Sequence, residues 1–353
     1  MPLRCSAPGP MQSRVQAISP AILRRHFRGD ARAGHVRCHI TVARHQQHRA
    51  RQKRMKKPKT GPQDPKLLDR IKSLAVQAMF SDDELLEQLV LKGGNAMALV
   101  HQISARASVD LDFSLKQDFG ENLEHVQARI FKTLSETFRA NGFEVFDFRM
   151  VERPKAITAD LRDFWGGYGV EFKLATAEMH VEHSANLEEL RKRAINLAQG
   201  TKFLIDISRF EYVEDKQDWD FDGTLIYVYS PSMIVCEKLR AICQQMPEYG
   251  PVVKRERLGS ARPKDFVDIF VLTKALELDL SGEPMRRILT SMFGVKKVPL
   301  SLLSLIPNYY EFHLAGFAAV ADTVSPDFDL QEFDVYFNYV LELVDRLKPT
   351  WDR

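Results

Sequence analysis

The sequence of 353 residues is 44% hydrophobic and 27% charged, the composition of an ordinary globular protein with length for about two domains. This composition excludes collagen, disorder of the whole chain and a small disulfide scaffold. Apolar runs such as 203–207 are interrupted by charge well before the roughly 20 residues that a membrane span needs. The four cysteines form no CxxC pair. We therefore expect a soluble, cytoplasmic protein with no membrane partner.

The net charge of +3 averages two unlike segments. Residues 1–60 hold 15 Lys and Arg and a single acid, whereas the rest of the chain holds 35 Lys and Arg and 46 Asp and Glu. The basic segment lacks periodic apolar positions and cannot build a core. It fits a disordered arm that contacts nucleic-acid phosphates, an organellar presequence, or an extension from a start codon assigned too early. We favour the extension, because Met55 opens a sequence typical of a bacterial protein start.

Hydrophobic periodicity predicts the elements that follow. Helices are expected from Asp64 to Met79, after a Ser81 cap, and over Ala96–Val100, Asn122–Arg139, Leu187–Leu197, Met233–Gln245, Pro263–Ala275, Met285–Phe293 and Leu330–Leu347. Strands are expected over Val109–Ser114, Phe143–Arg149, Gly169–His183, Lys202–Ser208 and Thr224–Tyr229, and a mobile basic loop over Pro247–Ala261. This order predicts an α/β (α+β) fold, with a mixed-sheet domain over 61–230 and a helical domain over 231–353.

Three acids on two predicted strands carry the chemistry. Asp110 and Asp112 share one strand face, because side chains alternate with a period of two. Like charges so close repel each other unless a cation lies between them, and carboxylate oxygens suit Mg²⁺. Asp206 is the lone carboxylate of an otherwise apolar strand, where an unpaired charge is costly, so it should face a cation. Together the three acids predict a two-metal site for phosphoryl or nucleotidyl transfer.

A glycine pair lies just upstream of these acids. Gly93 and Gly94, followed by Asn95 and a helical pattern, leave free backbone N–H groups at a helix N-terminus, where phosphate binds favourably. We interpret this turn as the phosphate-binding half of a nucleotide site. The plain alternative is a loop between two helices, and the acids nearby decide against it.

These motifs resemble a known family. The segments Lys92-Gly93-Gly94, Arg106-x-Ser108-x-Asp110-Leu111-Asp112, Ile205-Asp206-Ile207-Ser208, Glu237-Lys238-Leu239-Arg240 and Arg262-Pro263-Lys264-Asp265-Phe266-Val267-Asp268 occur in the order seen in AbiEii/AbiGii toxin nucleotidyltransferases, members of the polymerase-beta-like superfamily. The resemblance runs from about Met55 to the C-terminus. Asn95 departs from it, because the family usually has Ser or Thr there, and the hydroxyl contact to phosphate is lost.

The resemblance implies an enzyme that transfers a nucleotide from an NTP, with Mg²⁺ or Mn²⁺, to an acceptor such as the 3′ end of tRNA or another RNA. It implies an antitoxin encoded in the same operon. By position, Asp110, Asp112 and Asp206 would be the metal ligands and, with Lys238 and Asp268, the catalytic residues. Gly93, Gly94, Asn95, Arg106, Ser108 and Lys238 would bind the nucleotide.

Plainer interpretations remain open for single residues. Asp206 would otherwise be a strand-end turn residue and Lys238 an exposed helix lysine, while Asp265 fits the first turn of a helix. His180 and His183 would lie on opposite faces of a strand, so they predict no metal site, and Cys236 and Cys243 read as packed core thiols. Two other functions compete: a catalytically silent nucleic-acid-binding protein, and a nucleotidyltransferase that modifies a protein or a small molecule.

Overall fold

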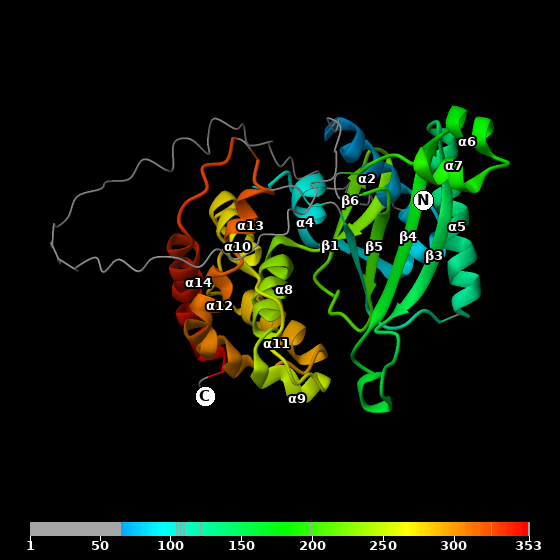
Figure 1. Cartoon of the computed structure of the whole chain (residues 1–353). Helices are drawn as coiled ribbons and strands as arrows, with labels where there is room; N and C mark the ends of the chain where they lie inside the picture. Colours follow the sequence, from blue (N-terminus) through cyan, green and yellow to red (C-terminus); the bar gives the residue numbers. More distant parts are fainter. Residues whose placement is uncertain are drawn as a thin grey trace, which may run out of the picture. The chain divides into compact units, whose positions relative to one another are not determined.

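The computed structural model describes residues 65–351 except 104, 106, 107, 109, 121, 198, 199 and 326. The basic segment 1–60 and the predicted nucleotide contact Arg106 therefore lie outside the described residues. All described residues belong to one compact unit, Thr60–Arg353. Figure 1 shows a sheet with α5 on one side and the C-terminal helices on the other.

Seven strands form one mixed sheet. They are β1 (Leu89–Lys92), β2 (Leu111–Leu115), β3 (Phe143–Arg153), β4 (Gly167–Thr176), β5 (Phe203–Ser208), β6 (Gln217–Phe221) and β7 (Thr224–Val228). Their spatial order is β3-β4-β5-β2-β1-β7-β6. The pairs β2/β5 and β1/β7 are parallel and the other neighbouring pairs are antiparallel. The predicted mixed α/β fold is confirmed.

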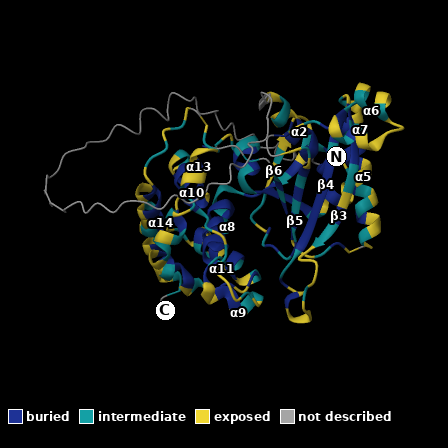
Figure 2. Ribbon diagram, in the orientation of Figure 1, coloured by how far each residue is buried: buried dark blue, intermediate teal, exposed yellow. Residues whose placement is uncertain are grey.

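The helices before β7 are α2 (Pro65–Phe80), α3 (Asp83–Gln88), α4 (Gly93–Asn95), α5 (Leu123–Ala140), α6 (Ala177–His183) and α7 (Leu187–Lys192), with a π-helical turn at Ala96–Val100 and a 3-10 turn at Ala159–Leu161. Of these, α2 and α5 cover one apolar sheet face, whereas α7 packs on the opposite face, where Leu190 lies in a cluster with Phe146 and Ala175. Alternation in β2 turns Phe113 toward α2, where its ring meets Phe80 at 5.8 Å between centroids. Phe172 of β4 meets Phe138 of α5 at the same distance. Figure 2 shows these strands buried and the outer side of α5 exposed.

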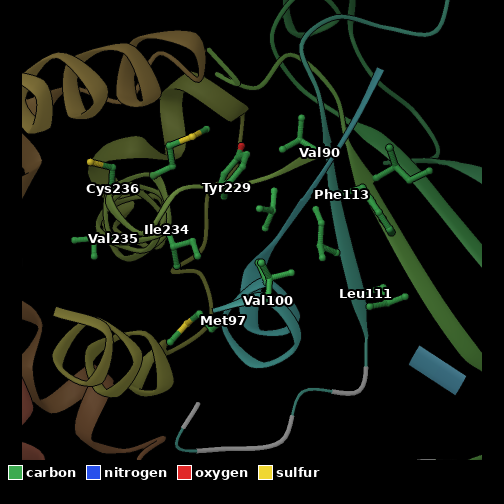
Figure 3. Close-up of a cluster of buried hydrophobic side chains, with 14 of the residues drawn as sticks. Val90, Met97, Val100, Leu111, Phe113, Tyr229, Ile234, Val235 and Cys236 are labelled. Atoms are coloured by element: carbon green, nitrogen blue, oxygen red, sulfur yellow. The ribbon is translucent and has the colours of Figure 1, made fainter. Parts of the chain in front are cut away.

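The opposite sheet face packs on the C-terminal helices. Figure 3 shows Val90 of β1 and Val100 on the sheet side of a buried cluster, with Ile234 and Cys236 of α8 (Pro231–Cys243) on the other side. The hydroxyls of Tyr229 and Ser114 join across this contact at 2.8 Å. Because apolar groups close this end of the interface, the polar residues of the same face collect further along the sheet.

The remaining elements are helical. They are α9 (Gly250–Val253), α10 (Pro263–Leu276), α11 (Glu283–Val295), α12 (Tyr310–Leu314), α13 (Ala318–Ala321) and α14 (Phe333–Leu347), with 3-10 turns at Pro247–Tyr249, Leu300–Tyr309 and Lys348–Thr350. Phe266 of α10 contacts Phe333 and Phe337 of α14 at 5.4 Å. No single described helix is both long and apolar enough to cross a membrane. Glu283–Val295 with Leu300–Leu314 passes only as a pair, which is bent by 87°.

Several predicted elements need correction. The strand expected to reach His183 ends at Thr176, whose side chain accepts a hydrogen bond from the Met179 N–H and begins α6. His180 therefore lies on a helix and not on a strand. Helix α3 is capped by Asp82 and not by Ser81. The loop expected over 247–261 contains two short helical turns. The domain boundary at residue 230 stays a prediction.

Candidate active site

A row of polar residues crosses the middle of the sheet. Lys92 of β1 is paired with Asp112 of β2, and Asp112 with Asp206 of β5. Paired residues share a sheet face, so the lysine and both carboxylates point to the same side. They line a pocket of about 510 Å³ whose other wall includes Lys238 of α8 and Lys264 of α10. The strand register alone thus brings together two of the predicted acids.

The three predicted carboxylates oppose one another electrostatically. Burial, with help from Glu237 and Asp206, raises the pKa of Asp112 from 3.8 to about 6 in spite of the neighbouring Lys92. Burial and the charge of Asp206 also raise the pKa of Asp110, while Lys264 and Arg153 lower it. Burial and neighbouring negative charges disfavour the ionised form of these carboxylates, and a bound cation would stabilise that form.

The glycine turn lies against the carboxylates. Gly93 has a φ of 72°, and a Cβ atom there would come within 2.5 Å of Asp112 Oδ2, so glycine is required for both backbone and space. Gly94 and Ser108 line the pocket too. Asn95 is fully buried, and its Nδ2 donates to the Asp110 carbonyl at 2.6 Å. In this structure Asn95 therefore positions the backbone of Asp110, and it does not line the pocket.

Lys238 lies in a buried ion cluster. Its Nζ is 2.7 Å from Asp268 Oδ2 and 3.4 Å from Asp265 Oδ1, and the Arg262 Nε donates to Asp265 Oδ2 at 2.5 Å. Although burial opposes ionisation of Asp265, Arg262 and Lys238 hold its pKa well below the usual range. The interpretation of Lys238 as an exposed helix lysine is wrong, because only 3% of the residue is accessible.

A second buried cluster forms the pocket wall, and two of its members, Glu211 and Lys296, were not among the predicted site residues. Glu211 Oε2 accepts from Arg240 Nη1 at 2.7 Å, and its Oε1 lies 3.5 Å from Lys296 Nζ and 3.7 Å from Lys92 Nζ. Burial alone would raise the pKa of Glu211, yet the three cations hold it well below the usual range. Glu211 thus faces three cations, and Glu237, which also lines the pocket, adds a second negative charge near Arg240.

Asp206 does face a cation, and that cation is Arg153. The Arg153 Nη1 donates to Asp206 Oδ1 at 2.9 Å, and its Nη2 donates to Glu171 Oε1 at 3.2 Å. The guanidinium reaches Asp206 across Gly169, where a Cβ atom would come within 2.4 Å of Arg153 Nε. The predicted turn role for Asp206 does not hold, because it lies inside β5.

The sequence matches a known protein family over most of its length. Residues 75–338 match the family described as "Nucleotidyl transferase AbiEii toxin, Type IV TA system". The chain belongs to the AbiEii nucleotidyltransferase toxin family. The predicted family and its link to toxin–antitoxin systems are confirmed by this match, which spans most of the chain and all the site residues described above, and the family description adds that the system is of type IV.

Two solved structures resemble this AbiEii protein distantly. A provisionally assigned nucleotidyltransferase from H. pylori has 12% identity, covers 81% of this chain and 95% of its own, and superposes with a TM-score of 0.43. An antigenic nucleotidyltransferase-like protein from Paracoccidioides brasiliensis has 16% identity, covers 69% of this chain and 95% of its own, and gives a TM-score of 0.32. No curated protein matches the chain.

The oxygen donors of this AbiEii site suit a hard divalent cation, and burial, with the charge of Asp206, raises the pKa values of Asp110 and Asp112 in spite of the nearby cations. Within the described part of the chain, no group of three or more His, Cys, Asp or Glu is arranged to hold a metal ion. The Arg153 guanidinium holds Asp206 Oδ1 in a hydrogen bond. The donor types fit Mg²⁺ or Mn²⁺.

Proposed function

We propose that this AbiEii protein transfers a nucleoside monophosphate from an NTP to the 3′ end of an RNA acceptor such as tRNA, with Mg²⁺ or Mn²⁺ as cofactor. The pocket that Asp112 and Asp206 line from adjacent parallel strands, beside the close turn at Gly93, carries the proposal. Clustered acids whose ionisation is opposed by burial cost stability, and such groups are typical of functional sites.

The residues of the glycine turn and the carboxylate cluster take different roles in the proposed reaction. Asp110, Asp112 and Asp206 would hold the metal ions, which supply neutralisation of phosphate charge when bound. Free backbone N–H groups at Gly93 and Gly94 would hold phosphate oxygens. Asp206 is the candidate to accept the proton of the attacking hydroxyl, because it is partly exposed beside the two other acids.

The role first predicted for Lys238 changes in this proposal. Its ammonium already contacts Asp265 and Asp268, so we assign it to fixing α8 against α10. The positive charge offered to a triphosphate would come from Lys92 and Arg240, which line the pocket and share Glu211. Pyrophosphate would be the leaving group.

A labelling experiment tests the reaction. Purified protein is incubated with each α-labelled NTP, total tRNA and Mg²⁺, and label in RNA is measured. We expect transfer with at least one NTP, loss with EDTA, and loss in Asp110→Asn and Asp112→Asn. Asp218→Asn, an exposed strand acid of β6 outside the pocket, is the matched control and should retain activity.

Other results would contradict the proposal. If no NTP gives transfer to any RNA, or if transfer persists in both site variants, the RNA nucleotidyltransferase assignment fails. Label found in protein or small-molecule fractions would identify a different acceptor. The toxin role is tested separately: expression of the wild type should arrest growth, Asp112→Asn should not, and co-expression of a neighbouring antitoxin gene should restore growth.

A further inference from the structure

Basic side chains gather at the β3 end of the same sheet face. Arg149, Arg153 and Lys202 have side chains that are 56%, 44% and 55% exposed. Arg191 of α7, at 39% exposed, lines a second cavity of about 300 Å³ together with Arg149 and Lys202. We call these four residues the β3–β4 basic surface. None of them belongs to the motifs that indicated the active site.

The second cavity is lined by four cations, Arg149, Lys173, Arg191 and Lys202, and by two acids, Asp147 and Glu171. Glu171 accepts from Arg149 Nε at 2.9 Å, from Lys202 Nζ at 3.1 Å and from Arg153 Nη2 at 3.2 Å. Although burial opposes its ionisation, the hydrogen bonds from Arg149 and Lys202 lower the pKa of Glu171. Asp147 accepts from Arg191 Nε at 2.8 Å and lies 3.1 Å from Lys173 Nζ, and Arg191 also contacts Glu188. The surface keeps a net positive charge while its side chains are held in place.

The basic surface continues into the active site. Arg149 is paired with Glu171 across β3 and β4. Arg153 lies four residues further along β3 on the same face, so the Cα atoms of the two arginines are about 13 Å apart. Arg153 also lines the active-site pocket and binds Asp206. A chain of cations therefore leads from the outer strand of the sheet to the carboxylates.

Such an array is suited to a polyanion. Exposed ion pairs are weak, so a phosphate can take over an arginine or lysine from its carboxylate. Arginine guanidiniums match phosphate oxygens with two parallel hydrogen bonds, and several contacts in line give affinity that depends on salt. A small-molecule acceptor would reach the carboxylates without needing cations as far out as Lys202.

We propose that the β3–β4 basic surface binds the phosphate backbone of the acceptor nucleic acid and directs its end toward Asp206. The proposal rests on the proposed function in taking a nucleic acid as acceptor, but binding can be measured without the reaction. Arg153 is the link in this arrangement: on exchanging Asp206 for a backbone phosphate, it releases that carboxylate to the reaction centre.

The test is binding of fluorescently labelled single-stranded RNA with a free 3′ hydroxyl, and of DNA of the same sequence, in the absence of NTP. The Arg149→Gln, Lys202→Gln double variant removes two outer cations. The matched control is Lys116→Gln, Arg287→Gln, which removes one lysine and one arginine that are 62% and 53% exposed, each in an ion pair and outside both cavities. Anisotropy gives Kd over a series of salt concentrations.

We expect Kd to rise about tenfold or more in the basic-surface variant, because charge-assisted hydrogen bonds are lost, and to stay near wild type in the control. The slope of log affinity against log salt should fall by about 1.4 for two lost contacts to single strands. If the double variant does not fold, Lys202→Gln alone should lower the slope by about 0.7.

Equal losses in the basic-surface and control variants, unchanged Kd in both, or wild-type protein that does not bind nucleic acid would each overturn the proposal. Failure of the proposed function is distinguishable: wild type that binds RNA through Arg149 and Lys202 but transfers no label keeps the surface and loses the reaction. Equally tight binding of RNA and DNA supports recognition of the phosphate backbone without the ribose hydroxyl.

Discussion

Neutralising Glu211 and Asp112, two acids of the same pocket, should change the free energy of unfolding in opposite directions. Glu211 is surrounded by three cations, whereas Asp112 faces other acids, and the pKa of the first is lowered while that of the second is raised. Replacing each by its amide keeps size and removes the charge. We expect Glu211→Gln to destabilise the protein and Asp112→Asn to stabilise it when no metal is present.

The surroundings of Glu211 and Asp112 set the expected changes in the free energy of unfolding. Removing one partner of a buried ion cluster leaves uncompensated charge, which costs about 3–5 kcal/mol, and Glu211 has Arg240, Lys296 and Lys92 as partners. The pKa of Asp112 is raised from 3.8 to about 6. At neutral pH its ionised form therefore disfavours folding by at most about 3 kcal/mol, and Asn removes that cost.

Urea unfolding at pH 7 in EDTA measures both changes. The control is Glu214→Gln, whose side chain is 55% exposed and pairs with Lys116, so the change should be under about 1 kcal/mol. The electrostatic reasoning is refuted if Glu211→Gln and Asp112→Asn shift the free energy of unfolding in the same direction. Adding Mg²⁺ should stabilise the wild type and leave Asp112→Asn nearly unchanged.

Two further predictions concern the glycine turn and a buried histidine. Gly93→Ala should abolish transfer because its Cβ would collide with Asp112, whereas Gly142→Ala, also at positive φ but with open space around it, should lose only about 1 kcal/mol of stability and keep activity. If both keep activity, the close approach is unimportant. Burial lowers the pKa of His313 to about 4, and its Nδ1 accepts from the Arg262 N–H. Below pH 6.5 the unfolded chain takes up a proton that the folded chain refuses, so stability should fall by up to about 3 kcal/mol between pH 6.5 and 4. Urea titrations across this range should show a smaller loss in His313→Gln, and an equal loss would contradict the assignment.

Alternation was enough to predict the strands that carry Asp112 and Asp206, whereas Asp110, which was expected on the same strand face as Asp112, precedes β2. Leu111, Phe113, Ile205 and Ile207 mark a buried face, so the opposite positions had to hold the carboxylates. Strand β1 was missed because it follows α3 without a turn and is buried at every position, which removes the period-two signal. Strand β6 was missed because three of its five residues are exposed and polar.

The ion partners of the site could not be read from the sequence. Arg153 lies 53 residues before Asp206, and Lys296 lies 85 residues after Glu211, so no local spacing joins them. The space left by Gly169 is visible only once β4 and β5 are paired. Asn95 was assigned to phosphate because a helix N-terminus was the only partner that spacing suggested, whereas the fold offers it the Asp110 carbonyl.

The order of strands in the sheet also decides when this protein can become active during its synthesis. Lys92, Asp112 and Asp206 are adjacent in space but leave the ribosome far apart in time, and the pocket wall is completed only by Lys296. Because domains fold as units once their last element is made, a nascent or truncated chain that ends before residue 296 has the strands without the enclosed pocket. The full set of pocket-lining side chains is therefore present only after Lys296 has been made.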